Sequence, residues 1–400
     1  MNAKEQLEII KRGVVEIIDE ESLLKKLEQS ISKNIPLKIK LGVDPTAPDI
    51  HLGFTVVMRK LRQFQDLGHQ VILIIGDYTA TVGDPSGKSK SRPRLSHEEV
   101  LKNAETYKEQ FFRIVDRNKT QVIYNGEWFK NLSFENTTEL MSRITVAQML
   151  ERLDFKNRYQ NGNPISLHEF LYPLMQGLDS LMIESDVEIG GTDQKFNVLV
   201  GRELQKDKEL CDKFSKPNQS PQIGLFMPIL LGTDGKNKMS KSFGNYVGIT
   251  EDPLQMFHKI YNIPDSLVEN WTLLLTNFSE EHTKSFKNVL EWKFNLAFEI
   301  VSQYYGKEIA EEVSNKEKKI QSGEMIPENI QEIYLETIWD LIDILVLSEI
   351  VSSKSEGKKL IQNGGVSLDG KKVLENITNI PNESILKIGK RKFYKIMKGK

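Results

Sequence analysis

One stretch near the N-terminus, rich in glycine and proline, decides the fold. It reads Lys40-Leu41-Gly42-Val43-Asp44-Pro45-Thr46-Ala47-Pro48-Asp49-Ile50-His51-Leu52-Gly53-Phe54. The alternation in Leu37–Lys40 predicts a strand that leads into it. Gly42, Pro45 and Pro48 then interrupt any regular structure. Apolar residues follow at the spacing of a helix, at Leu52, Val56, Val57, Leu61, Phe64 and Leu67.

Val71–Ile75 predicts a buried strand, so the stretch is the loop of a strand–loop–helix–strand unit. The loop ends where the helix begins, and a helix N-terminus offers unpaired N–H groups and partial positive charge. Gly53 lets another group approach the backbone closely. The loop is therefore either a phosphate-binding site or a connection capped at Asp49.

The composition predicts a globular protein of two or three domains. The chain has 400 residues, of which 39% are hydrophobic and 28% charged. Its single cysteine, Cys211, excludes intrachain disulfides and thiolate metal clusters, and it favours a reducing cytoplasm. The six histidines lack ligand spacing, so we expect no dedicated protein metal site. We expect neither a signal peptide nor a membrane span, because apolar runs are too short.

The charge is unevenly distributed along the chain. Residues 354–400 hold 12 Lys or Arg against 4 Asp or Glu, a net of +8, whereas the whole chain carries −2. A basic tail on a nearly neutral chain predicts contact with an acidic polymer, and nucleic acid is the usual one.

Hydropathy patterns divide the chain into four parts. Strands and helices alternate up to residue 232, which predicts a doubly wound α/β domain. Within it we expect helices over 1–35, 144–160 and 166–184, and a strand over 226–231. A loop with three lysines follows at 233–245, and the pattern is then helical from Asp252 to about Ile350, with a domain boundary near Thr250. A basic helix, a glycine turn and strands follow from Glu356. Asp369-Gly370 predicts a hairpin turn in this tail.

Three further segments are candidates for binding. Gly76–Ser89 is a basic glycine loop after a strand, although its glycine spacing fails that of a Walker A loop. Tyr172, Gln176 and Asp179 share one stripe of an otherwise apolar helix and need polar partners. Asp193 follows a strand and two glycines, where α/β folds hold a ribose hydroxyl.

The lysine-containing loop, Thr233–Asn245, is the last candidate. Its lysines stand among small polar residues, so it is either a mobile clamp for a polyphosphate or an ordinary surface turn.

With these segments in view, the chain resembles the bacterial tyrosyl-tRNA synthetases along its whole length. His51-Leu52-Gly53-Phe54 is similar to the HIGH motif of class I synthetases, and Lys238-Met239-Ser240-Lys241-Ser242 matches KMSKS letter for letter. The tail from about Leu341 resembles the S4 RNA-binding module. The resemblance implies a Rossmann-like doubly wound catalytic domain (1–232), the KMSKS loop and linker (233–250), an all-α anticodon-binding domain (251–338) and a small α+β S4-like domain (339–400).

The resemblance also implies a two-step reaction. Tyrosine and ATP, the latter with Mg²⁺, give tyrosyl-adenylate and pyrophosphate, and the tyrosyl group then passes to tRNA(Tyr). A cytoplasmic homodimer is implied. The residues implied for catalysis are Thr46, His51, Lys88, Arg92, Lys238 and Lys241. Those implied for ATP are Gly53, Gly191, Asp193, Met239, Ser240 and Lys241. Those implied for tyrosine are Lys40, Gly42, Asp77, Thr79, Asp84, Tyr172, Gln176, Asp179 and Gln194.

In that implied site, Asp84, Tyr172 and Gln176 hold the α-ammonium group of tyrosine, Gln194 its carboxylate and Asp179 its phenolic hydroxyl. The chain departs from the family pattern at two positions. Phe54 replaces the last histidine of HIGH, and Lys40 stands where one branch of the family has a tyrosine that contacts the substrate hydroxyl. Asp77 is a candidate for that missing contact.

Three other functions compete with this one. A tryptophan-specific synthetase shares the ATP motifs, and a carboxylate also suits an indole N–H. A nucleotidyltransferase of the HxGH type would lack the 238–242 loop and the basic tail. An RNA-binding protein could keep the fold without the activity.

Overall fold

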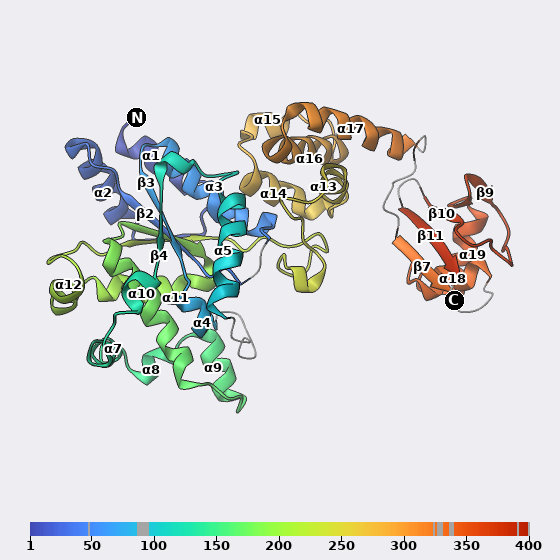
Figure 1. Ribbon diagram of the computed structural model, residues 1–400. Coiled ribbons are helices and arrows are strands. Elements are labelled where there is room, and N and C mark those ends of the chain that lie inside the picture. The colour runs from blue at the N-terminus through green and yellow to red at the C-terminus, as the bar shows by residue number, and fades with distance from the viewer. Residues whose placement is uncertain are drawn as a thin grey trace. The chain divides into compact units, whose positions relative to one another are not determined.

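The computed structural model describes residues 1–46, 49–85, 96–322, 325, 331–335, 340–389 and 392–398. The chain divides into two compact units, Met1–Tyr304 and Tyr305–Lys400, which are described separately (Figure 1). Two residues implied for catalysis, Lys88 and Arg92, lie outside the described residues.

A six-stranded sheet forms the centre of the first unit, in the order β1-β6-β5-β2-β3-β4. Its strands are β1 (Glu16–Ile18), β2 (Lys38–Val43), β3 (Gln70–Ile75), β4 (Thr120–Tyr124), β5 (Val187–Gly191) and β6 (Ile223–Met227). Only β1 runs antiparallel to its neighbour, and the other pairs are parallel. Parallel strands are covered on both faces, which explains why β3 and β6 are apolar and almost completely buried. The sheet confirms the predicted doubly wound α/β domain.

The strand order places a ligand site. From β2 the chain proceeds through β3 to β4 on one side, and it returns to place β5 on the other side of β2. The loops after β2 and β5 therefore leave the same edge of the sheet in opposite directions. Such a switch point is where open α/β sheets bind ligands.

Helices surround these strands in Figure 1. Those up to β6 are α1 (Ala3–Lys11), α2 (Glu20–Lys33), α3 (Leu52–Asp66), α4 (Thr79–Val82), α5 (His97–Phe111), α6 (Gly126–Phe129), α7 (Phe134–Met141), α8 (Val146–Met149), α9 (Leu153–Gln160), α10 (Leu171–Ile183), α11 (Lys195–Leu204) and α12 (Lys208–Phe214). Short 3₁₀ turns are η1 (Arg117–Lys119), η2 (Leu167–Phe170) and η3 (Thr192–Gln194). The packing of α3 on β3 and β5, and of α10 on α11, positions the helix that His51 caps and the helix that carries Tyr172, Gln176 and Asp179.

Three predicted elements differ from the structure. Residues 1–35 are not only helical, because β1 separates α1 from α2 and adds an edge strand beside β6. The single helix predicted over 144–160 is two short helices, since Arg152 is extended between them. The last strand of the sheet lies at Ile223–Met227, earlier than the predicted 226–231.

The rest of the first unit is helical. After η4 (Lys241–Phe243) come α13 (Pro253–Tyr261), η5 (Asp265–Leu267), α14 (Val268–Leu275), α15 (Glu280–Lys284) and α16 (Val289–Tyr305). Asp252 caps α13 and Pro253 occupies its first position. The expected domain boundary near residue 250 stays a prediction, since the first unit continues to Tyr304. Trp271 of α14 is completely buried and donates its indole N–H to Leu231 O at 3.2 Å.

The second unit contains a five-stranded sheet in the order β7-β11-β10-β8-β9. Its elements are α17 (Lys307–Ser322), β7 (Gln331–Leu335), α18 (Leu341–Leu347), α19 (Lys354–Gln362), β8 (Val366–Leu368), β9 (Lys371–Val373), β10 (Ile385–Ile388) and β11 (Lys392–Lys398). Asp369 and Gly370 both have positive φ, 49° and 80°, so the predicted hairpin turn joins β8 to β9. The pattern over 251–338 contained no predicted strand, but β7 pairs in parallel with β11.

Candidate active site

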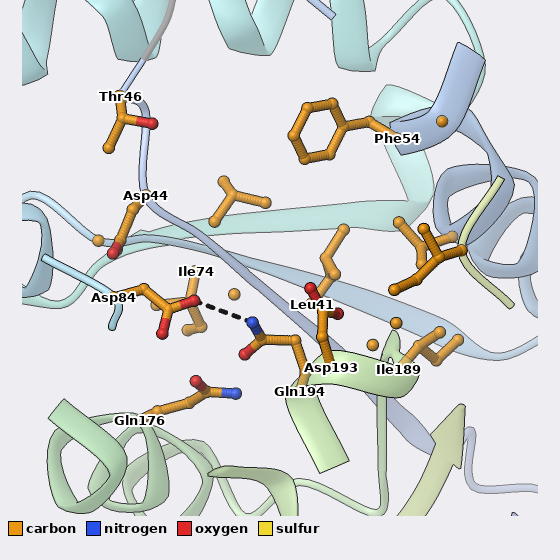
Figure 2. A pocket seen from close by; sticks show the side chains of 18 of the residues that line it. Leu41, Asp44, Thr46, Phe54, Ile74, Asp84, Gln176, Ile189, Asp193 and Gln194 are labelled. Atoms are coloured by element: carbon orange, nitrogen blue, oxygen red, sulfur yellow. Dashed lines mark hydrogen bonds between the residues drawn. The ribbon is translucent and has the colours of Figure 1, made fainter. Parts of the chain in front are cut away.

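A cavity of about 380 Å³ lies at the switch point of the first unit. Its wall comes from the β2–α3 loop, α10, the turn after β5 and the 238–240 loop. Fifteen of the residues implied for the site line it: Gly42, Thr46, His51, Gly53, Thr79, Asp84, Tyr172, Gln176, Asp179, Gly191, Asp193, Gln194, Lys238, Met239 and Ser240. Segments far apart in sequence thus converge, as the labelled side chains in Figure 2 show.

His51 is the N-cap of α3, and a hydrogen bond fixes the tautomer of its neutral ring. Its Nδ1 accepts the Gly53 N–H at 3.2 Å, so in the neutral ring the proton sits on Nε2 and can be donated. Burial, with the Lys241 charge, lowers the pKa of His51 to about 4. A Cβ on Gly53 would come within 2.9 Å of the His51 ring, which explains the glycine. The histidine is therefore a neutral hydrogen-bond donor near pH 7.

Phe54 lies in the first turn of α3, three residues after His51, and lines the cavity. Its ring centroid lies 4.6 Å from that of His51, and 47% of the residue is exposed (Figure 2). A phenyl ring cannot donate a hydrogen bond, so the polar contacts of this motif fall to His51.

The 238–242 loop is fastened to the β2–α3 loop. Met239 is buried, and its sulfur accepts the Gly53 N–H at 3.3 Å. Lys241 does not line the cavity, because its Nζ pairs with Asp49 Oδ2 at 2.6 Å. Asn245 orders the loop from below by accepting the Ser240 N–H at 2.8 Å. Of the two motif lysines, Lys238 faces the cavity in this arrangement.

Asp44 organises the α10 side of the cavity. Tyr172 donates its hydroxyl to Asp44 Oδ2 at 2.8 Å, and Thr79 donates to Oδ1 at 2.7 Å. A Cβ on Gly76 would lie 2.1 Å from Oδ1, so only glycine fits there. The sequence pattern did not single out Asp44, although it lies inside the stretch that decides the fold.

Asp179 is buried, and its carboxylate accepts hydrogen bonds from two side chains. Trp128 Nε1 donates to Oδ1 at 3.0 Å and Asn125 Nδ2 to Oδ2 at 3.2 Å. Burial raises the pKa of Asp179 to about 7, although the positive charge of Lys40 and both hydrogen bonds oppose this. Asn125 and Trp128 escaped the sequence analysis, although they directly follow β4, whose carboxyl end meets the same edge of the sheet.

A chain of amides and charges connects the remaining candidates. Gln194 Nε2 donates to Asp84 Oδ2 at 2.9 Å, the dashed line of Figure 2. Arg152 also reaches Asp84, at 3.4 Å, and donates to Asn197 Oδ1 at 2.9 Å. Asn197 Nδ2 in turn donates to Gln194 Oε1 at 3.1 Å. The extended backbone at Arg152, which broke the predicted helix, brings its guanidinium to this site.

Two residues implied for tyrosine do not line the cavity. Asp77 is buried, but its Oδ1 accepts the Gly126 N–H at 2.7 Å, and Lys130 and His97 lie 3.8 and 3.9 Å from Oδ2. The expected contact of Asp77 with the substrate hydroxyl stays a prediction, since these partners lie outside the cavity wall. Lys40 is completely buried and faces α10 and β5 instead of the cavity.

Within the described ranges, no group of three His, Cys, Asp or Glu side chains is arranged to hold a metal ion. Across the same part of the chain, no helix is both long and apolar enough to cross a membrane.

Comparisons with known proteins agree with this geometry. Residues 32–326 match the family described as tRNA synthetases class I (W and Y). The tyrosine--tRNA ligase of Carboxydothermus hydrogenoformans is 48% identical over 413 residues, which covers 98% of each chain. That of Aquifex aeolicus is 47% identical over 405 residues and covers all of both chains.

Solved structures show the same fold at lower identity. A C-terminally truncated mitochondrial tyrosyl-tRNA synthetase from Aspergillus nidulans is 23% identical, with a TM-score of 0.65 over 80% of this chain and 94% of its own. The enzyme from Archaeoglobus fulgidus, complexed with L-tyrosine, is 22% identical, with a TM-score of 0.60 over 78% and 100%. With near-full-length relatives at almost half identity and a cavity built from both signature motifs, this chain belongs to the class I tRNA synthetases, in the family of the tyrosine--tRNA ligases.

Proposed function

We propose that the cavity joins L-tyrosine to ATP as tyrosyl-adenylate and that the enzyme then esterifies the 3′ end of tRNA(Tyr). The observation that carries this is one continuous cavity whose wall holds both the His51 and Met239 motifs and the buried Asp179. The part of the cavity beside His51 and Met239 suits a nucleotide, and the part beside Asp179 suits a phenol. Amino-acid-dependent exchange between ATP and pyrophosphate across the twenty amino acids tests the proposal.

The first step needs positioning more than covalent help. The tyrosine carboxylate attacks the α-phosphorus in line, the bond to the β-phosphate oxygen breaks, and pyrophosphate leaves with the extra negative charge. His51 donates from Nε2 to the phosphates, Thr46 offers its hydroxyl, and Lys238 adds a positive charge. Lys241, Lys88 and Arg92 complete the clamp, and Lys241 must first leave Asp49. The Mg²⁺ arrives with ATP as part of the substrate.

The amino acid occupies the α10 side. Asp84, Tyr172 and Gln176 receive its ammonium group, and Gln194 donates to its carboxylate. The same side of the wall holds Asp179, the acceptor for the phenolic hydroxyl. Phenylalanine would leave this buried acceptor without its partner, which is costly. On the nucleotide side, Asp193, Gly191 and Ser240 contact the ribose and phosphates.

The tRNA contacts the helical part (251–338) and the basic tail (339–400). Twelve Lys or Arg residues against four acids in residues 354–400 supply counter-charges for phosphates. The helix pair α18 and α19 with the small sheet is the S4-like domain of this proposal. The observed strand β7 belongs to the sheet of this unit, so the proposed domain begins at residue 331 or earlier.

The segment from Phe134 to Leu167 of the first unit suits contact with a second copy of this chain. Its exposed apolar residues lie in one run of the sequence: Phe134 (87%), Met141, Val146, Leu153, Tyr159 and Leu167 (82%). The same segment contributes Leu140 and His168 to the lining of a cavity of about 360 Å³. Large exposed apolar side chains are typical of interfaces, and a two-fold dimer is the commonest homo-oligomer. Sedimentation of the Phe134→Asp variant beside the natural protein tests this proposal.

The single cysteine of the chain, Cys211, is a buried thiol, which fits a cytoplasmic location.

A further inference from the structure

A buried ion pair lies at the centre of the sheet beside the cavity. Lys40 of β2 and Glu188 of β5 are register partners, and Lys40 Nζ lies 2.9 Å from Glu188 Oε1. Their side chains are 0% and 2% exposed. Glu188 lines the cavity and Lys40 does not. Removing two charges from water is expensive, so such a pair needs a reason beyond stability.

Lys40 has no donor left for a substrate. An ammonium group has three N–H bonds. Those of Lys40 point to Gln176 O at 2.9 Å, to Ser180 Oγ at 2.7 Å and to Glu188. Lys40 therefore acts through other residues and does not contact the tyrosine hydroxyl.

Glu188 is equally engaged. Its Oε1 accepts from Gln176 Nε2 at 3.0 Å, in addition to the bond from Lys40. Its Oε2 accepts from Ser180 Oγ at 2.9 Å and Gln222 Nε2 at 2.6 Å. Lys40 thus donates to the main-chain oxygen of Gln176, and Glu188 accepts from its side-chain nitrogen. Asn197 donates to the remaining amide oxygen at 3.0 Å.

The same pair sets the charge beside Asp179. The charged groups acting on this carboxyl are Lys40 from β2 and Glu188 from β5, and its hydrogen-bond donors are Asn125 and Trp128 after β4. The positive charge of Lys40 lowers the pKa of Asp179 and the negative charge of Glu188 raises it. The two members of the pair therefore act on Asp179 in opposite directions.

We propose that Lys40 and Glu188 are positioning residues for tyrosine recognition, which orient Gln176 and balance the charge beside Asp179 without touching the substrate. The inference rests on the proposed function, since it assigns the tyrosine to Gln176 and Asp179. It also accounts for Lys40 at a position where a direct contact was expected from resemblance.

The double variant Lys40→Met with Glu188→Gln tests the proposal, because it removes both charges together and leaves no buried unpaired ion. We expect the KM for tyrosine to rise roughly tenfold, while kcat and the KM for ATP change by less than about threefold. The matched control is Arg158→Met with Glu169→Gln, a pair with 3% exposure on each side that does not line the cavity. It should leave the KM for tyrosine unchanged, whatever its effect on stability.

The pH profile of tyrosine binding separates positioning from a structural role. The single variant Lys40→Met should move the midpoint of binding upward and Glu188→Gln downward, each by roughly one pH unit. A folded double variant with the natural KM for tyrosine, or single variants that move the midpoint in the same direction, would overturn the inference alone. A natural protein without tyrosine-dependent exchange would overturn the proposed function, and this inference with it.

Discussion

At the scale of single residues, His51 is held in one tautomer, whereas Phe54 has no group that can donate a hydrogen bond. The His51 ring accepts the Gly53 N–H on Nδ1 and keeps its proton on Nε2, which is the donor proposed for the phosphates. Phe54 lies against that ring at 4.6 Å and contributes only packing. Hydrogen bonding by this motif therefore depends on one histidine, His51.

We accordingly expect unequal effects from two substitutions. His51→Ala should cut exchange between ATP and pyrophosphate by about 10²-fold or more, because a donor to the developing charge is lost. Phe54→His should change the rate only a few-fold, since one hydrogen bond to a partly wet ligand is worth about 0.5–1.5 kcal/mol. A thousandfold gain in Phe54→His would mean that the natural protein is a crippled synthetase, and the RNA-binding alternative would return.

Two buried histidines make stability depend on pH. Burial lowers the pKa of His51 and of His69 to about 4, and His69 bonds to Leu37 N–H and Gln6 Oε1 in its neutral form. The unfolded chain takes up these protons near pH 6.5 and the folded chain does not, so the free energy of unfolding falls as pH drops from about 6.5 towards 4.

Each histidine contributes about 1.4 kcal/mol per pH unit across that window. Denaturant unfolding at pH 7 and pH 5 measures the loss. His69→Gln keeps polar atoms at the site but does not titrate, so its loss between the two pH values should be smaller than that of the natural protein. An equal loss in both proteins would contradict the assignment to His69.

At the scale of elements, Lys241 connects the 238–242 loop to the β2–α3 loop through its ion pair with Asp49. Lys238 faces the cavity, whereas Lys241 is paired with Asp49 on the opposite loop. Positive charges of this kind act mainly as charge develops on pyrophosphate.

Lys238→Ala and Lys241→Ala should each slow adenylate formation by about 10²-fold while tyrosine affinity stays nearly unchanged. Pre-steady-state formation of the adenylate and equilibrium tyrosine binding, measured on the same preparations, separate the two effects. The control is Lys236→Ala, which alters a lysine of the same loop outside the motif and the cavity wall. A variant that loses tyrosine affinity but keeps its rate would show that the loop has another role.

The elements also show what a sequence can predict. The central strands, α3, α10 and the motif loops follow from hydrophobic period and glycine placement, because packing and turn geometry act locally. Arg152 broke a predicted helix, since its guanidinium bonds to Asp84 and Asn197 outweigh the helical period. Asn125, Trp128 and Glu188 were missed because their partners are distant in sequence, and only the sheet order brings them together.

At the scale of the whole molecule, the cavity and the basic tail belong to different units of the chain. All residues that line the cavity belong to the first unit. The basic residues of the tail belong to the second, whose core includes Leu345, Val366 and Leu386. Because β7 pairs with β11, a truncation at Leu341 would leave β7 without its partner, so the cut belongs before Gln331.

A protein that ends at Ser322 should therefore keep tyrosine-dependent exchange and lose most of its tRNA charging. The lost phosphate contacts should also flatten the dependence of charging on salt. Charging assays from low to physiological salt, beside exchange assays on the same protein, measure both. Unaltered charging with an unaltered salt dependence would contradict an RNA-binding role for the tail.

The central proposal is that the buried carboxyl of Asp179, in the cavity proposed to bind ATP, selects a phenol. Exchange between ATP and pyrophosphate, measured with tyrosine, phenylalanine and tryptophan in the natural protein and in Asp179→Asn, tests it most directly. We predict that exchange in the natural protein depends on tyrosine. In Asp179→Asn, the ratio of the exchange rate with tyrosine to the rate with phenylalanine should fall by at least about tenfold. A natural protein that prefers tryptophan, or an Asp179→Asn variant with undiminished preference for tyrosine, would contradict the account.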